Sequence, residues 1–383
     1  MIITEDILYA GVFDEEIDLF EGQYPVENGV SYNSYIIMDS KVAVMDGVDG
    51  RFSGAWLAGI EEKLQGRQPD FIVVHHMEPD HGASVWAFLK KYPGSKMVAS
   101  AQAVKVAQNY FLQDLSERCV AVKEGDVLEL GKHTLHFVAA PMVHWPEVMV
   151  SYDSCSKALF SADAFGTFGP FEWDDDWACE ARRYYFGIVG KFGAQAQNLL
   201  KKAAGLDISM ILPLHGPVIK EKLAYCVDLY QKWASYTPEC DGVAVCYASV
   251  YGGTKAAAEE LVKQLEISGQ HQIELFDLAR CDQSEALEAA FRYPKLVLAS
   301  PTINSNVFPA VKNFIMALAD HNYQKRLVAL VETGMWAPCS AKIMGDLLSG
   351  CKEITFANTK VKITGHAKDD DIAALKALAA ELA

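Results

Sequence analysis

Four side chains that can bind a metal fall within six residues of the sequence. They are His76, Glu78, Asp80 and His81, in the segment 74–84. The alternation of the first three would place them on one side of an extended backbone. Acids and histidines gathered this closely are costly to bury unless a cation lies among them. The segment therefore predicts a metal site rather than an ordinary polar loop.

Three further candidate ligands each follow an expected strand. They are His144, Asp163 and His215, which come after the apolar stretches 135–140 and 157–161 and after the stretch that begins at residue 210. A single histidine after a strand is more often a structural hydrogen-bonding residue, so each alone is weak evidence. As a set that follows the first cluster, they predict one shared site, because loops at one end of a sheet converge.

The elements that must position these residues alternate between strands and helices. Short apolar, β-branched segments are expected to be strands, and stretches with apolar residues three or four apart are expected to be helices. In the first half of the chain the expected strands are 31–38, 42–46, 71–74, 96–100, 135–140 and 157–161, and the expected helices are 55–64, 84–91 and 103–112.

The composition limits the possible partners. The chain has 383 residues, enough for two domains, and its 34 basic and 50 acidic residues give a formal charge of −16. Such a chain offers no basic face to nucleic acid or to an anionic membrane. No signal peptide and no spanning helix is evident, so we expect a cytoplasmic protein. The nine cysteines form no Cys-x-x-Cys pair, which favours reduced thiols and argues against a rubredoxin site.

The pattern changes near residues 236–242, which are polar and contain proline and glycine. We therefore expect one domain over 1–238 and a second over 242–383. The second shows five β–α units, the pattern of a doubly wound parallel sheet. Its expected strands are 243–247, 272–277, 296–300, 327–332 and 361–364, and its expected helices are 255–264, 284–291, 311–320, 341–348 and 370–382.

Three loops of this second domain could hold a nucleotide. The first follows the first strand and opens a helix, where backbone amides and hydroxyls can bind a phosphate. It consists of Ser249, Val250, Tyr251, Gly252, Gly253 and Thr254. The other two follow later strands and contain Pro301, Thr302, Ile303 and Asn304, and Thr333, Gly334, Met335 and Trp336. A phosphate loop, a polar loop and an aromatic loop together predict a flavin mononucleotide (FMN) site; the alternative is a domain with ordinary turns.

With these motifs the whole chain resembles the flavodiiron proteins (A-type flavoproteins). The first domain is similar to the metallo-β-lactamase fold, an αββα sandwich whose usual signature is His-x-His-x-Asp-His followed by a His, an Asp and a His. Glu78 stands here in place of the second histidine, as it does in the flavodiiron family. A carboxylate is a harder ligand than imidazole, which moves the preference from zinc toward iron. The second domain is similar to flavodoxin, with a five-stranded parallel sheet.

The resemblance implies a ligand set and an activity. One iron would be bound by His76, Glu78 and His144 and the other by Asp80, His81 and His215, with Asp163 bridging; His81 is the ligand least regular in the family. These residues, His81 apart, would be the catalytic ones, and FMN would supply electrons. The family reduces dioxygen to water, nitric oxide to nitrous oxide, or both.

The resemblance also implies partners. A separate rubredoxin-like protein would donate electrons, and a head-to-tail homodimer or a tetramer would bring the flavin of one protomer beside the irons of another. Trp145 and Glu147 could line that junction, and Tyr184 and Tyr185 could reach the substrate pocket. The sequence departs from the family at Asn28, where many relatives have histidine, and in the loop 334–337.

Two other classes of function fit parts of the sequence. A zinc hydrolase with an appended flavodoxin domain suits the fold, but Glu78 argues against it and hydrolysis would leave the flavin without a role. A non-catalytic electron carrier or redox sensor would need only a structural metal. Structural zinc prefers a closed set of four cysteine and histidine ligands, unlike seven mixed ligands with three carboxylates.

Overall fold

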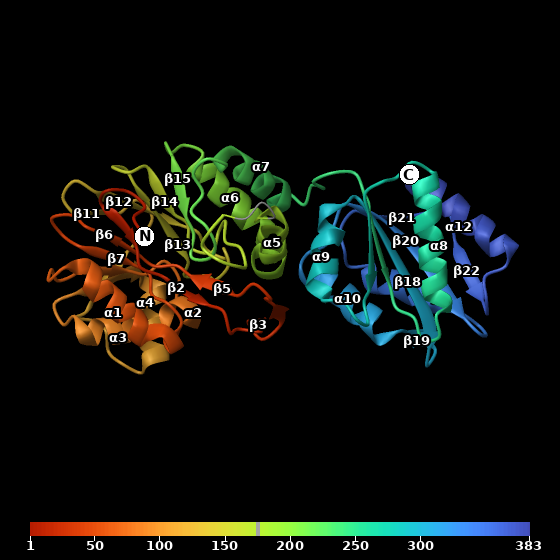
Figure 1. Cartoon of the computed structure of the whole chain (residues 1–383), viewed down its shortest axis with the longest axis horizontal. Helices are drawn as coiled ribbons and strands as arrows, with labels where there is room; N and C mark the ends of the chain where they lie inside the picture. The colour runs from red at the N-terminus through yellow and green to blue at the C-terminus, as the bar shows by residue number, and fades with distance from the viewer. Residues whose placement is uncertain (174–176) are drawn as a thin grey trace. The chain divides into compact units, whose positions relative to one another are not determined.

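The computed structural model describes residues 1–173 and 177–383, and these form two compact units, Met1–Ala234 and Ser235–Ala383 (Figure 1). Each unit has its own sheets and its own core. None of the helices among the described residues combines the length and apolar character that crossing a membrane requires.

The first unit contains two large sheets. One has six strands, in the order β1 (Ile7–Tyr9), β6 (Tyr35–Ile37), β7 (Ala43–Met45), β8 (Phe71–Val73), β9 (Lys96–Ser100) and β10 (Cys119–Val122). The other has five, in the order β11 (Val127–Glu129), β12 (Thr134–Ala139), β13 (Met149–Asp153), β14 (Ala158–Phe160) and β15 (Met210–Leu212). Two small ribbons pair β2 (Val12–Asp14) with β5 (Val30–Tyr32), and β3 (Leu19–Phe20) with β4 (Tyr24–Pro25).

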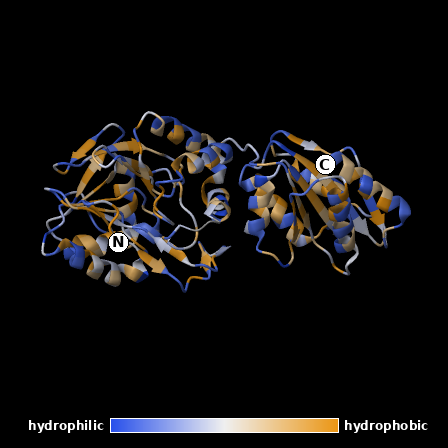
Figure 2. Ribbon diagram, turned by 45° about the horizontal axis from the view of Figure 1, so that its top comes forward, coloured by the Kyte–Doolittle hydropathy of each residue, from blue (hydrophilic) through white to orange (hydrophobic). Residues whose placement is uncertain are grey.

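The core of this unit lies between the two large sheets. Alternate residues of facing strands, such as Tyr35 and Ile37 from one sheet and Leu135 and Phe137 from the other, are buried in one cluster. This is the alternation expected of strands that present one face to a packed partner sheet. In Figure 2 the strands of this layer are coloured mainly as hydrophobic.

Helices flank the sheets on both outer sides (Figure 1). On one side lie α1 (Ser53–Leu64), α3 (Val85–Lys91) and α4 (Ala101–Phe111), and on the other lie α5 (Trp177–Tyr184), α6 (Gly193–Ala203) and α7 (Leu223–Ala234). The expected αββα sandwich is therefore confirmed.

Two expectations about this unit are corrected. The single strand expected over 31–38 is two strands, β5 and β6, separated at Asn33, whose side-chain amide donates hydrogen bonds to the carbonyls of Pro213 and Gly216. The extended backbone expected through Asp80 ends at Glu78, because a one-turn helix, α2 (Pro79–Gly82), begins there. Proline is suited to this first helical position, since its φ is preset and it needs no amide partner.

The second unit has one parallel sheet flanked by helices on both faces (Figure 1). Its main strand order is β17 (Ile273–Asp277), β16 (Val243–Tyr247), β18 (Lys295–Ile303), β20 (Arg326–Gly334) and β21 (Ile354–Phe356), while β22 (Val361–Thr364) also pairs with β20 and β19 (Asn306–Val307) with β18. The helices are α8 (Gly253–Ile267), α9 (Gln283–Arg292), α10 (Pro309–Asp320), α11 (Ser340–Leu348) and α12 (Asp369–Leu382). This order is the flavodoxin-like one, which confirms the expected fold class.

Two details differ from the expected sheet. The fifth position is shared by β21 and β22, which pair in parallel with successive parts of β20. Strand β18 runs to Ile303 and turns back at Asn304 and Ser305, both with positive φ, whereas the sequence predicted a loop from residue 300. Such a tight turn is typical of hairpins, because positive φ matches the twist of the paired strands.

Candidate metal centre

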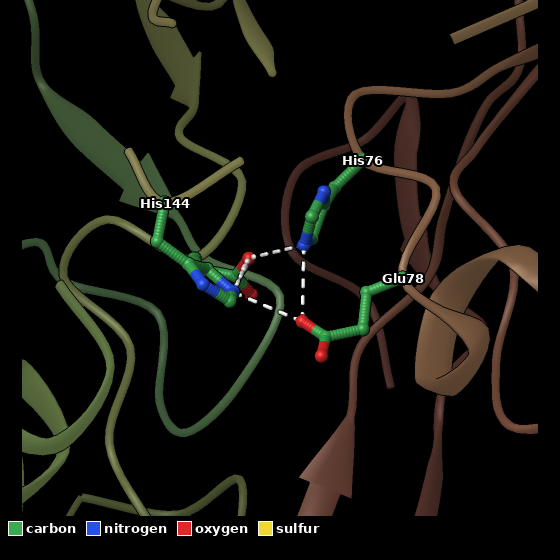
Figure 3. A group of neighbouring side chains, drawn as sticks. His76, Glu78 and His144 are labelled. Atoms are coloured by element: carbon green, nitrogen blue, oxygen red, sulfur yellow. Dashed lines mark hydrogen bonds and ion pairs between the residues drawn. The ribbon is translucent and has the colours of Figure 1, made fainter. Parts of the chain in front are cut away.

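The first half of the centre combines residues from three loops that follow strands. His76 Nε2 lies 3.1 Å from Glu78 Oε2 and 3.3 Å from Asp163 Oδ2. His144 Nε2 lies 2.9 Å from the same glutamate oxygen and 3.6 Å from the same aspartate oxygen. Figure 3 shows His76 and Glu78 on one segment and His144 on another, with the three side chains pointing toward one another. All four ligand-type atoms lie within 4.8 Å of one another, a grouping that could hold a metal ion.

The second half combines Asp80, His81 and His215. The Nε2 atoms of the two histidines are 2.9 Å apart, and each lies 3.3 Å from Asp80 Oδ2. Asp163 faces this group with its other oxygen, Oδ1, at 3.5 Å from His215 and 3.7 Å from His81. One carboxylate thus presents one oxygen to each group, which suits a ligand that bridges two cations.

The donor set fits bound cations rather than an internally satisfied polar cluster. Both side-chain oxygens of Asp163 and Oδ1 of Asp80 are buried and, among the described residues, have no hydrogen-bond partner. His76 Nδ1 lies 2.8 Å from a carboxylate oxygen of Glu147 and must donate to it. In neutral His76 the lone pair on Nε2 then faces two carboxylate oxygens, an arrangement that a cation between them would stabilise.

His215 has the same tautomer for a different reason. Its Nδ1 lies 2.8 Å from the backbone carbonyl of Ser31, which can only accept a hydrogen bond. In neutral His215 the proton is therefore on Nδ1, and the Nε2 lone pair faces the centre.

The ionisation states reflect the mutual dependence of these groups. Burial would raise the pKa of Glu78, but hydrogen bonds with His144 and His76 lower that pKa to about 2. Burial likewise opposes ionisation of Asp80, yet His81 and His215 hold its pKa well below the usual value. The pKa of His76 is raised well above normal, because Asp163, Glu147 and Glu78 outweigh the effect of burial. Negative charge from these carboxylates thus favours a cation at this position.

Glu147 lies inside the first unit, so the expectation that it lines a junction between protomers is wrong. Its side chain has no solvent exposure, and its Oε1 accepts hydrogen bonds from His76 and from the backbone amide of Met77 at 3.1 Å. Trp145 packs edge-on against His76, with ring centroids 5.2 Å apart. Nothing in the sequence around Glu147 indicated that its side chain would point into the unit, toward His76.

Aromatic rings cover the second half of the centre. Phe20, Tyr32 and Tyr184 lie with ring centroids 5.4, 5.8 and 5.4 Å from that of His215. Burial raises the pKa of Tyr184 well above its usual value, and Asp163 adds to the effect, so this hydroxyl keeps its proton. The ring of Tyr184 thus lies near the centre, and its contact with a substrate pocket stays a prediction. Tyr185 instead packs against Tyr230 and Trp233, which corrects its expected place.

The loops predicted to bind a nucleotide meet at the carboxyl ends of strands in the second unit. They enclose a cavity of about 480 Å³, which is within the range of sites for small ligands. Of the predicted loop residues, all except Gly252 line the cavity: Ser249, Val250, Tyr251, Gly253, Thr254, Pro301, Thr302, Ile303, Asn304, Thr333, Gly334, Met335 and Trp336. Ser305, Ala337 and Gly365 also line it.

The chemistry of this cavity suits a phosphate and a flat apolar ring. Ser249 Oγ accepts a hydrogen bond from the amide of Gly252, whose φ of +89° places the turn before α8. The hydroxyls of Thr254 and Thr333 are 2.7 Å apart. Among the described residues that line the cavity there is no lysine or arginine, so a phosphate would be held by hydroxyls and by amides at the start of α8. Trp336, 76% exposed, offers a stacking face.

Comparison with known proteins finds a family model that matches the first unit and relatives that match most of the chain. A family model described as "ODP family beta lactamase" matches residues 30–216. An anaerobic nitric oxide reductase flavorubredoxin of Aliivibrio fischeri is 27% identical over 337 residues, 85% of this chain and 67% of that protein. The chain thus spans about two thirds of that relative.

Two solved structures match both units. The rubredoxin oxygen:oxidoreductase of Desulfovibrio gigas has a TM-score of 0.92 at 25% identity, with 100% of this chain and 97% of that chain covered. The flavodiiron protein of Giardia intestinalis also has a TM-score of 0.92, at 23% identity, with 99% and 95% covered. The ligand set and the two units agree with the first match, and the second match shares the fold, so the whole chain resembles the flavodiiron proteins.

Proposed function

We propose that this chain is a flavodiiron oxidoreductase that reduces dioxygen to water, nitric oxide to nitrous oxide, or both, with two irons and FMN. The observation that supports it most directly is Asp163, whose two oxygens face two separate groups of ligand-type atoms. The names of the relatives, a nitric oxide reductase and an oxygen oxidoreductase, define the two candidate substrates.

The candidate ligands fall into two groups, one for each proposed metal position. His76, Glu78 and His144 would hold one iron, and Asp80, His81 and His215 the other, with Asp163 between them. When bound, the two irons supply paired electrons to a diatomic gas, and FMN replenishes them. The protein's part is to hold lone pairs and carboxylates toward the cations and to exclude water, which the rings of Phe20, Tyr32 and Tyr184 do on one side.

The flavin is assigned to the cavity of the second unit. Its phosphate would lie against the hydroxyls of Ser249 and Thr254 and the first amides of α8, where the helix dipole favours an anion. Its ring would lie between the loops that carry Ile303 and Trp336. Electrons would come from a separate rubredoxin-like protein, in keeping with the name of the D. gigas relative.

The test is the metal and flavin content of protein produced with ample iron and purified without oxygen. We expect two irons and one FMN per chain, and flavin reoxidation that accelerates when dioxygen or nitric oxide is mixed in. The faster of the two gases identifies the better substrate. Zinc that iron does not displace, together with hydrolytic activity and no retained flavin, would instead support the zinc hydrolase.

Electron transfer between protomers can be tested separately, since we propose a head-to-tail homodimer or a tetramer built from it. His144→Ala removes a metal ligand, and Gly253→Glu places a negative charge where the phosphate would bind. Neither variant alone should be active. Co-produced, they should recover about one quarter of wild-type activity, because half of the dimers are mixed and each has one complete pair of centres. No recovery would mean that both centres must be in one chain.

A further inference from the structure

The two halves of the metal centre have different support behind their histidines. Behind His76 lies a carboxylate: Glu147 Oε1 is 2.8 Å from His76 Nδ1. Glu147 is itself held in place, because its Oε1 also accepts the amide of Met77 and its backbone carbonyl accepts the hydroxyl of Ser100 at 2.9 Å. The side chain of Glu147 is fully buried and is anchored on both sides of the loop.

The other half has no such charge. His215 donates through Nδ1 to a neutral backbone carbonyl, that of Ser31. His81 Nδ1 is buried and, within the described part of the chain, has no hydrogen-bond partner. Neither histidine is therefore made more basic by an anion behind it.

This difference bears on metal binding through two physical effects. A carboxylate behind an imidazole increases the electron density that the ring offers to a metal and fixes its orientation. In addition, Glu147 brings a buried negative charge whose second oxygen, Oε2, has no hydrogen-bond partner in the described structure. Such a charge is costly until a cation approaches. Binding at the His76 side therefore relieves the penalty of Glu147 in addition to that of its ligand carboxylates, whereas, among the described residues, the His215 side has only the ligand carboxylates Asp80 and Asp163.

We infer that Glu147 is a positioning residue that makes the two metal positions inequivalent. The position formed by His76, Glu78 and His144 binds its metal first and more tightly, and the position formed by Asp80, His81 and His215 fills second. The inference rests on the proposed two-metal site, and it adds an order of filling and the residue that sets it.

The experiment is anaerobic titration of metal-free protein with Co²⁺, followed by the visible absorption of the bound ion. Wild type should bind two Co²⁺ in two resolved steps. His144→Ala should abolish the tighter step and His81→Ala should affect only the weaker one, which assigns each step to a position. Glu147→Gln should weaken the tighter step 10- to 100-fold, the range seen when such a supporting carboxylate is lost, and leave the weaker step unchanged.

A matched control is available in the same unit. Asp153 is also a fully buried carboxylate that bonds to a histidine, with Oδ2 2.7 Å from Nδ1 of His133, and neither residue belongs to the two groups of ligand-type side chains. Asp153→Asn should lower stability without changing either Co²⁺ step. If Glu147→Gln does not fold, Glu147→Asp, which keeps the charge but shortens the reach, should still weaken the tighter step selectively.

The outcomes separate this inference from the function on which it rests. Two equal steps in wild type, or a tighter step that Glu147→Gln leaves intact, would overturn the inference while the two-metal site stands. Wild-type protein that binds no Co²⁺ at all would overturn the metal site itself.

Discussion

Replacing Asp163 with asparagine should remove more metal affinity than any other single change in the centre. Its two oxygens are 3.3 to 3.7 Å from Nε2 atoms in both halves, so one substitution affects both positions. At a separation of about 4 Å and an effective dielectric constant of about 20, one carboxylate attracts a unit charge by about 4 kcal/mol, and a divalent ion more. The amide dipole of asparagine recovers part of the larger attraction for a divalent ion, so the expected net loss of binding free energy is about 4 kcal/mol.

That energy corresponds to roughly a thousandfold loss of affinity for the tighter metal, since each 1.4 kcal/mol is tenfold. The measurement is competition for Co²⁺ or Fe²⁺ against a chelator of known affinity, in the absence of oxygen. FMN content serves as the internal control, because the cavity to which we assign FMN lies in the other unit and should be unaffected. A loss of tenfold or less would refute the bridging role, and a parallel loss of FMN would indicate general unfolding.

Three further predictions concern single side chains. Thr254→Val removes a hydroxyl 2.7 Å from that of Thr333, and we expect roughly tenfold weaker FMN binding by fluorescence titration, with Thr254→Ser close to wild type. Tyr184→Phe should leave metal content unchanged, because the tyrosine contacts His215 through its ring; loss of iron would contradict this. The hydrogen bond to Asp153 raises the pKa of His133 despite burial. The stabilisation of the fold by protonated His133 paired with Asp153 is therefore fully present below about pH 6.5 and is lost as pH rises through the raised pKa. His133→Asn should therefore lower the free energy of unfolding in urea by about 1–2 kcal/mol at pH 6 and by less at pH 9; an effect that grew with pH would contradict the assignment.

The metal cluster could be predicted from sequence because its chemistry is local. His76, Glu78, Asp80 and His81 are close in the chain, and their density alone predicts a cation site. His144, Asp163 and His215 could be predicted for a different reason, since each follows a strand and such loops meet at one end of a sheet. The parallel sheet of the second unit could be predicted equally well, because its strands are long, apolar and regularly separated by helices.

The residues that surround the centre could not be predicted, because their partners are distant in sequence. Glu147 contacts a histidine 71 positions earlier, and only the fold brings them together. Phe20 reaches His215 from β3, a strand of two residues with no periodicity to detect. The break between β5 and β6 at Asn33 depends on carbonyls of residues 213 and 216.

The charges of the centre favour a pair of divalent cations over a single one. Glu78, Asp80, Asp163 and Glu147 together contribute four negative charges around neutral imidazoles, and two divalent ions contribute four positive ones. Buried charge is tolerated when it is compensated, so one ion alone would leave two charges unpaired. Replacing Glu78 with histidine, as in the zinc-dependent signature, removes one of these charges. That change should weaken binding of the second divalent ion to the loaded centre less than Asp163→Asn does, because it alters the charge at one position while Asp163 faces both.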